Sequence, residues 1–151
     1  MAEFTYNAVQ VVNPNQPVVL NTSIGCGRGY VYHRNESGIV TLRGIVNNPT
    51  SGFARYQVVF NGNIAVPEGG TAGPIAVAIA IDGEALMTSR AIVTPAAAGD
   101  YFNVTSTAII DVPKGCCTQI AIECTSAAND GITPAVAINV QNANLTVSRI
   151  A

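Results

Sequence analysis

IAVPEGGTAGPIAVAIAIDGE, residues Ile64 to Glu84, is the stretch that decides the fold. It reads as a short strand (Ile64–Val66), a turn rich in glycine and proline, and a second strand (Ile75–Ile81) in which large and small apolar residues alternate. A period of two is typical of β-structure, and proline ends a strand because it has no N–H to donate to the ladder. Asp82-Gly83 then predicts a tight hairpin turn.

The same pattern occurs a second time in the chain. Val66-Pro67-Glu68-Gly69 precedes the apolar strand that begins at Ile75, and Val112-Pro113-Lys114-Gly115 precedes Ile120-Ala121-Ile122. In each copy a strand ends at Val-Pro, a glycine turn follows, and the next strand begins seven or eight residues after the proline. Two copies are too few for a solenoid. We interpret them as two equivalent corners of one jelly roll.

Other β-prone runs, separated by turn residues, occupy most of the remaining chain. They are Phe4–Val12, Val18–Leu20, Tyr30–His33, Ile39–Val46, Phe53–Phe60, Leu86–Thr94, Tyr101–Val112, Gln119–Thr125, Ala135–Val140 and Leu145–Ile150. Asn61-Gly62 predicts a hairpin, and Gln141–Asn144 predicts a turn between the last two strands. Helical periodicity is absent over any ten residues. The pattern therefore predicts an all-β sandwich or jelly roll, as a single domain over residues 1–151.

The composition favours an oligomer. Charged residues make up 11% of the chain, against about 25% in an average soluble domain, and hydrophobic residues make up 48%. Yet no run reaches the roughly 18 apolar residues that a membrane helix needs, so we expect no membrane partner. A homo-oligomer interface is more apolar than ordinary surface, and oligomerisation would cover what this chain otherwise exposes.

The charge distribution argues against nucleic acid as a partner. The net charge is −2, and the seven basic residues are dispersed rather than gathered into a stripe. The N-terminal stretch MAEFTYNAVQ has neither the basic region nor the apolar region of a signal peptide. We therefore expect synthesis in the cytoplasm without a signal peptide.

The four cysteines are Cys26, Cys116, Cys117 and Cys124. Neighbouring cysteines cannot easily bridge each other, and no CxxC pair suggests a zinc site. Most of the four are interpreted as small, semi-buried hydrophobic residues. A bridge from Cys26 to Cys116 or Cys117 stays open, as do redox activity and subunit cross-linking by the Cys116-Cys117 pair.

Few other residues suggest chemistry. His33 is the single histidine, and we interpret it as a polar residue at a strand end. Asp82 and Glu84 could hold Ca²⁺ with loop carbonyls, but a hairpin tip explains them better. Gly69–Gly73 lacks the lysine of a phosphate loop and reads as a flexible turn. Because no nucleophile–base or paired-carboxylate arrangement emerges, we expect no enzyme, no catalytic residues, no metal and no cofactor.

The closing residues ANLTVSRIA (Ala143–Ala151) resemble the last strand of the C1q/TNF-like jelly roll, and so does the Val-Pro-x-Gly pattern within Val112–Ser126. The start MAEFTYNAVQVV and the stretch VPEGGTAGPIAVAIAIDGE are similar to small structural proteins of gut Firmicutes phages. The whole also resembles bacterial collagen-like glycoprotein C-terminal domains, although this chain contains no Gly-X-Y stalk.

The C1q/TNF resemblance implies a compact homotrimer with apolar and aromatic residues along the threefold axis. Some aromatic residues must fill the monomer core instead, and the sequence does not sort the two groups. The candidates are Tyr30, Tyr32, Phe53, Tyr56, Phe60, Tyr101 and Phe102. We also expect Ile79→Asp to block assembly.

The leading functional hypothesis is a non-enzymatic structural protein: a trimeric virion component such as a capsid decoration or head-fibre protein of a tailed phage, placed on a virion or extracellular surface. An alternative is a carbohydrate- or receptor-binding module that acts through loops at one end, and exposed Tyr or Arg within residues Asn21–Arg34 would support it. A bacterial surface or spore-coat protein is the third hypothesis.

Overall fold

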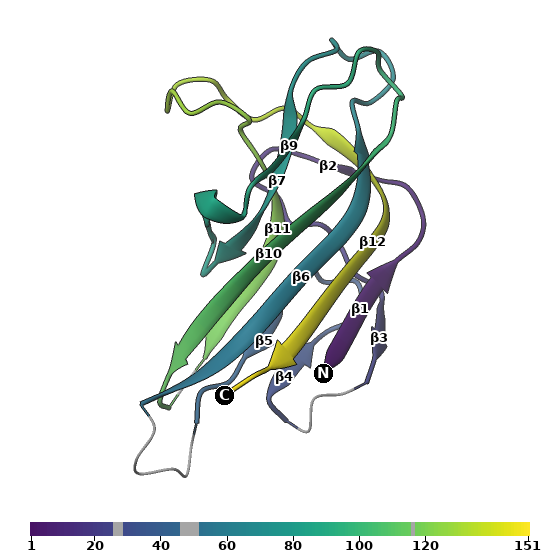
Figure 1. The fold of residues 1–151 in the computed structure, drawn as a ribbon. Coiled ribbons are helices and arrows are strands. Elements are labelled where there is room, and N and C mark those ends of the chain that lie inside the picture. Colours follow the sequence, from purple (N-terminus) through teal and green to yellow (C-terminus); the bar gives the residue numbers. More distant parts are fainter. Residues whose placement is uncertain (26–28, 46–51, 116) are drawn as a thin grey trace.

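Two antiparallel sheets of six strands each form a β-sandwich in the computed structural model, which describes residues 1–25, 29–45, 52–115 and 117–151 (Figure 1). Sheet A has the order β10-β6-β12-β1-β3, with β2 also pairing with β12. Sheet B has the order β4-β5-β11-β7-β8, with β9 also pairing with β7. This architecture confirms the all-β prediction.

The strands of sheet A are β1 (Ala2–Tyr6), β2 (Gln10–Val12), β3 (Thr22–Ile24), β6 (Phe53–Ala65), β10 (Phe102–Pro113) and β12 (Ile138–Arg149). Those of sheet B are β4 (Val31–His33), β5 (Val40–Leu42), β7 (Ile75–Ile81), β8 (Glu84–Ala85), β9 (Ala91–Val93) and β11 (Thr118–Thr125). A short 3-10 turn, η1 (Met87–Ser89), links β8 to β9.

The two Val-Pro sites are corners where the chain crosses from sheet A to sheet B. β6 leads into β7 at one end of the sandwich, and β10 leads into β11 at the other end (Figure 1). β6 and β10 pair antiparallel along their whole length, and so do β7 and β11 over six residues. The prediction of two equivalent jelly-roll corners is therefore confirmed.

Side-chain alternation builds the core from both sheets. Along β6, alternate residues from Ala54 to Ile64 point inward and are fully buried. They join one buried cluster with residues of β7, β10, β11 and β12. Ile79 belongs to this cluster and has no exposed surface. A carboxylate buried there without a partner would oppose folding itself, so Ile79→Asp would block assembly through loss of the fold rather than at an interface, and its effect on assembly stays a prediction.

The Asp82-Gly83 hairpin is confirmed and the Asn61-Gly62 hairpin is wrong. Asp82 and Gly83 have φ angles of 51° and 88°, as a type I′ turn requires. Gly62 instead lies inside β6, opposite Val104 of β10. A Cβ atom at Gly62 would lie 2.9 Å from Cζ of Phe60. Glycine is needed there because the buried Phe60 ring lies against its backbone, not because the chain turns.

The expected turn at Gln141–Asn144 is also wrong. β12 runs through it as one strand, and its register with β6 shifts between Gln141 and Asn144. Asn142 has a φ of 55°, a conformation that asparagine tolerates better than most residues. The polar run is therefore a β-bulge, and the two expected strands form one.

Three further strands expected from the sequence differ from the strands in the structure. The run Phe4–Val12 is divided between β1 and β2, and Leu86–Thr94 is divided between η1 and β9. Val18–Leu20 is no strand, although Pro17 and Leu20 form isolated bridges to Glu123 and Ser37. Such short edge segments depend on tertiary packing that local sequence does not show. In the part of the chain that the structure describes, no helix has the length and apolar character to cross a membrane.

The Phe60–Gly62 contact generates a stability prediction. We expect Gly62→Ala to lower the free energy of unfolding by about 1–3 kcal/mol, because the added methyl overpacks a filled core. Gly73→Ala is the matched control, since nothing lies within 4 Å of a Cβ atom there, and we expect a change within about 0.5 kcal/mol. Urea denaturation of both variants checks this, and equal midpoints would contradict the role assigned to Gly62.

Candidate functional site

The structure sorts the seven aromatic candidates into two groups. Tyr56 and Phe60 are fully buried. The Tyr56 hydroxyl donates to the Arg43 carbonyl at 2.6 Å, and burial raises the pKa of this phenol. The other five are exposed: Tyr30, Tyr32, Phe53, Tyr101 and Phe102. The molecule has two candidate surfaces, one on each sheet.

The first surface is the solvent-facing side of β1, β6, β10 and β12, which we call the sheet A outer face. Strand register places Thr107 opposite Val59, Val59 opposite Thr146, and Thr146 opposite Glu3. Most of its other side chains are polar and uncharged: Gln57, Asn61, Asn63, Asn103, Thr105, Asn144 and Ser148. Because the core fills the inner face, alternation directs all of these outward.

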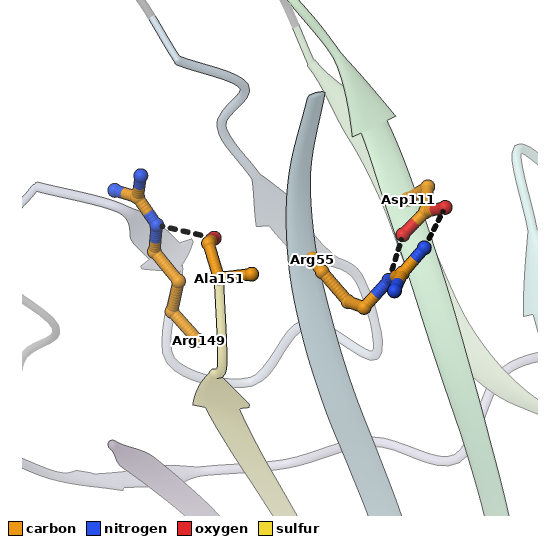
Figure 2. Close-up of polar contacts among 4 residues, drawn as sticks. All are labelled: Arg55, Asp111, Arg149 and Ala151. Carbon is orange, nitrogen blue, oxygen red and sulfur yellow. Dashed lines mark hydrogen bonds and ion pairs between the residues drawn. The ribbon is translucent and has the colours of Figure 1, made fainter. Parts of the chain in front are cut away.

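The sheet A outer face carries one ion pair and the carboxylate of Glu3. The Arg55 guanidinium donates to both carboxylate oxygens of Asp111, from Nε at 2.7 Å and from Nη2 at 2.9 Å (Figure 2). This pairing lowers the pKa of Asp111 and raises that of Arg55. Glu3 accepts a hydrogen bond from the Asn144 amide. The face therefore presents little uncompensated charge.

Amide hydrogen bonds order one end of this face. Nδ2 of Asn103 donates to Oδ1 of Asn61 at 2.7 Å and to Oδ1 of Asn63 at 3.1 Å. These contacts cross from β10 to β6, so they fix side chains that would otherwise be free to rotate. A pre-ordered face loses less conformational entropy when a partner covers it.

Exposed apolar residues lie among these polar ones. Ile109 of β10 is 62% exposed and sits opposite Gln57. Ile24 of β3 is also exposed, and it sits opposite Glu3. A surface with few charged residues and isolated large apolar side chains resembles the composition of a protein–protein interface.

The second surface is a shallow groove of about 410 Å³ on sheet B, which we call the β4–β5 groove. It is lined by Tyr32, His33, Arg34, Ser37, Ile39 and Thr41. Tyr32 and Thr41 face each other across the β4–β5 ladder. Nη1 of Arg43 donates to the Tyr32 hydroxyl at 3.1 Å, and its Cζ lies 5.9 Å from the ring centroid.

A second stacked pair lies beside the buried Tyr56. Cζ of Arg149 lies 4.4 Å from the Tyr30 ring centroid, and Nε of Arg149 donates to the Ala151 carbonyl at 3.2 Å (Figure 2). The sequence analysis missed both arginine–tyrosine pairs. The sequence does contain a signal for the Arg43–Tyr32 pair. Residues 30–43 have the pattern of a strand, a turn and a strand, which places Tyr32 and Thr41 on one face.

His33 is the last residue of β4, which confirms its interpretation as a polar residue at a strand end. Its Nε2–H donates to the Ser37 carbonyl at 2.9 Å, and Nδ1 accepts from the Ser23 hydroxyl at 3.0 Å. The ring also packs against Phe4, with centroids 4.7 Å apart. Both nitrogens are therefore occupied in holding β3 and the β4–β5 turn together.

The acidic and glycine-rich candidates are turn residues. Oδ1 of Asp82 accepts the Gln119 N–H at 2.9 Å, which ties the β7–β8 hairpin to β11. Gly69 has a φ of 84°, and the Gly70 N–H donates to the Pro67 carbonyl at 2.9 Å. Across residues 1–25, 29–45, 52–115 and 117–151, no three His, Cys, Asp or Glu side chains gather as a metal site would require.

The cysteines differ from one another. Cys117 is disulfide-bonded, an outcome that the sequence left open beside the interpretation of most cysteines as small hydrophobic residues. Cys124 is free and buried, as expected, with its thiol 2.9 Å from the Val136 carbonyl. Burial raises the pKa of Cys124 to about 11. Cys26 and Cys116 lie outside the described residues, and so do the bridges that were left open for them.

No protein-family model and no curated protein sequence matches the chain. Among solved structures, the globular domain of zebrafish complement 1qA protein is similar to it, with a TM-score of 0.56 and 15% identity over 96% of this chain and 94% of that one. The C-terminal domain of EclA, a sugar-binding protein, gives a TM-score of 0.36 and 16% identity over 82% of this chain and 87% of that one. The first likeness shows a C1q-like β-sandwich, which confirms the predicted jelly-roll fold.

The environment of Cys124 generates a prediction about reactivity. With a pKa of about 11, only about one thiol in a thousand is ionised at pH 8, and the thiolate is the reactive form. We expect Cys124 to resist iodoacetamide in the native protein and to react fully after denaturation. Peptide mapping by mass spectrometry measures both, and rapid native labelling of Cys124 would contradict the burial.

Proposed function

We propose that this protein is a non-catalytic structural module that assembles as a homotrimer and serves as a virion component, such as a capsid decoration or head-fibre protein of a tailed phage. The observation that carries the proposal is the sheet A outer face. Its side chains are mostly polar and uncharged, its one ion pair is Arg55–Asp111 among the described residues, and it exposes Ile109 on the edge strand β10. Depletion of charged residues is the compositional signal that distinguishes the core of a protein–protein interface from other surface.

A second copy of the chain is the partner that we propose for this face. Arg55 and Asp111 neutralise each other, so Glu3 is the one carboxylate on this face without a cationic partner among the described residues, and repulsion between identical surfaces is small. A standard interface buries about 1,600 Å², and a trimer has three of them. The C1q-like fold supports three copies rather than two, because the C1q/TNF resemblance implies a trimer.

The location that we propose is the outer surface of a virion, reached after synthesis in the cytoplasm. A module on such a surface needs stability and shape complementarity rather than a reaction centre. The described residues are consistent with that role, because the candidate chemical groups His33, Asp82 and Cys124 are engaged in the fold.

A binding module for a carbohydrate or receptor is the second candidate function. One observation favours it. Tyr30 and Tyr32 are exposed, and they lie within Asn21–Arg34, where exposed tyrosine or arginine is expected for such a module. Because the β4–β5 groove lies on sheet B, assembly through sheet A and binding through sheet B are compatible.

The assembly proposal generates a prediction at Ile109. We expect Ile109→Asp to keep the fold and to weaken the trimer at least tenfold, because it places three unpaired carboxylates, one from each chain, in the proposed interfaces. Ile132→Asp is the matched control: Ile132 is 85% exposed and lies in the loop between β11 and β12. Sedimentation equilibrium measures both variants. Equal association of Ile109→Asp and the wild type would contradict the interface.

The virion role has its own test. We expect antibodies against the protein to decorate intact purified particles at regular positions in electron micrographs. The control is a particle preparation that lacks the gene product. Absence of the protein from mass spectra of purified particles would contradict the virion role while leaving the trimer untouched.

A further inference from the structure

We propose that the β4–β5 groove binds a saccharide that carries a carboxylate, with the sugar ring on Tyr32 and the acid group between Arg34 and Arg43. This inference deepens the second candidate function and rests on it. It is independent of assembly through sheet A. The groove is lined by an aromatic surface, the guanidinium group of Arg34 and hydroxyl groups, and Arg43 contacts its aromatic surface from outside the lining; these are the features that an acidic sugar requires.

The aromatic surface is Tyr32. Its side chain is 48% exposed although it lies within a strand. Its hydroxyl accepts a hydrogen bond from Arg43, so the ring is held in place rather than free to turn. Sugar rings present C–H groups that pack against aromatic faces, and an aromatic side chain with a held polar tip offers both apolar contact and orientation.

The cationic groups are Arg34 and Arg43. Arg34 lines the groove, and Arg43 reaches its edge through the contact with Tyr32. Within the described ranges, the single ion pair is Arg55–Asp111 on the other sheet. Neither groove arginine therefore has a carboxylate partner among those residues. Arginine matches the two oxygens of a carboxylate in a planar, bidentate geometry.

Acidic side chains near the groove lie to one side of it. Asp82 and Glu123 line a different cavity of about 220 Å³, and Ile39 lines both cavities. Glu36 lies in the β4–β5 turn but does not line the groove. Among the described residues that line the β4–β5 groove, one is an arginine and none is acidic.

The size and rigidity of the groove favour a sugar over a small inorganic ion. About 410 Å³ falls within the roughly 300–1,000 Å³ of small-molecule sites. Thr41 supplies a hydroxyl to its surface, and Ile39 supplies an apolar wall. His33 fixes the turn through Ser23 and Ser37, so little ordering remains to oppose binding.

Isothermal titration of the full chain tests this inference with two acidic probes, tetragalacturonate and sialyllactose. The controls are carboxyl-reduced tetragalacturonate, lactose and inorganic sulfate. We expect at least one acidic probe to bind, and its neutral counterpart and sulfate to bind at least tenfold more weakly. The two acidic probes distinguish a uronic acid from a sialic acid as the source of the carboxylate.

Four variants locate the binding. We expect Arg43→Gln and Arg34→Gln each to weaken binding about tenfold or more, as loss of a charge-assisted hydrogen bond does. Tyr32→Ala should do the same, whereas Tyr32→Phe keeps the ring and should lose less. Lys114→Gln removes one positive charge from an exposed corner outside the groove, and it should leave binding unchanged. Thermal unfolding confirms that each variant is folded.

The inference would be overturned if neither acidic probe bound at millimolar concentration, or if the neutral probes or sulfate bound as tightly as the acidic probes. It would also be overturned if Lys114→Gln weakened binding as much as the groove variants do. Sedimentation of the same samples separates this inference from the assembly proposal. A trimer without sugar binding would contradict only the groove. A monomer that binds the acidic probe would contradict only the assembly.

Discussion

Side-chain alternation across β6, β10 and β12 is the constraint on which the rest of the structure depends. These are the longest strands, and their pairing, continuous between β6 and β10 and interrupted by one bulge between β6 and β12, fixes which residues point inward. Tyr56 and Phe60 fill the inner side, so their neighbours must form the outer face. The outer residues are mostly uncharged, although charged side chains would be equally compatible with the ladder. The proposed interface between chains rests on that composition.

The corners of the fold could be predicted from sequence because their causes are local. Proline ends a strand wherever it stands, and Asp82-Gly83 favours positive φ by itself. Gly62 and Asn142 were misread for the opposite reason. The glycine accommodates Phe60 within the same strand, and the asparagine belongs to a bulge against β6. Both depend on packing between strands, which a local turn signal does not contain.

The candidate surfaces were predictable only in part. Exposed tyrosines near residue 30 were anticipated as a mark of a binding module, but the seven aromatic residues could not be sorted into core and surface. Alternation explains Tyr56 and Phe60 once the register of β6 is known. The Arg43–Tyr32 contact needs the β4–β5 ladder to bring residues eleven positions apart together. Arg55 and Asp111 are 56 positions apart, so their pairing had no local signal.

Assembly on sheet A and recognition on sheet B would place a ligand groove on the opposite side of the sandwich from the subunit contacts. The central claim is that the sheet A outer face is covered by copies of the chain. The native mass of the wild-type protein at micromolar concentration tests it most directly. The account predicts a single species of three times the 15.6 kDa chain mass. A stable species of one chain mass, with the fold intact, would contradict it.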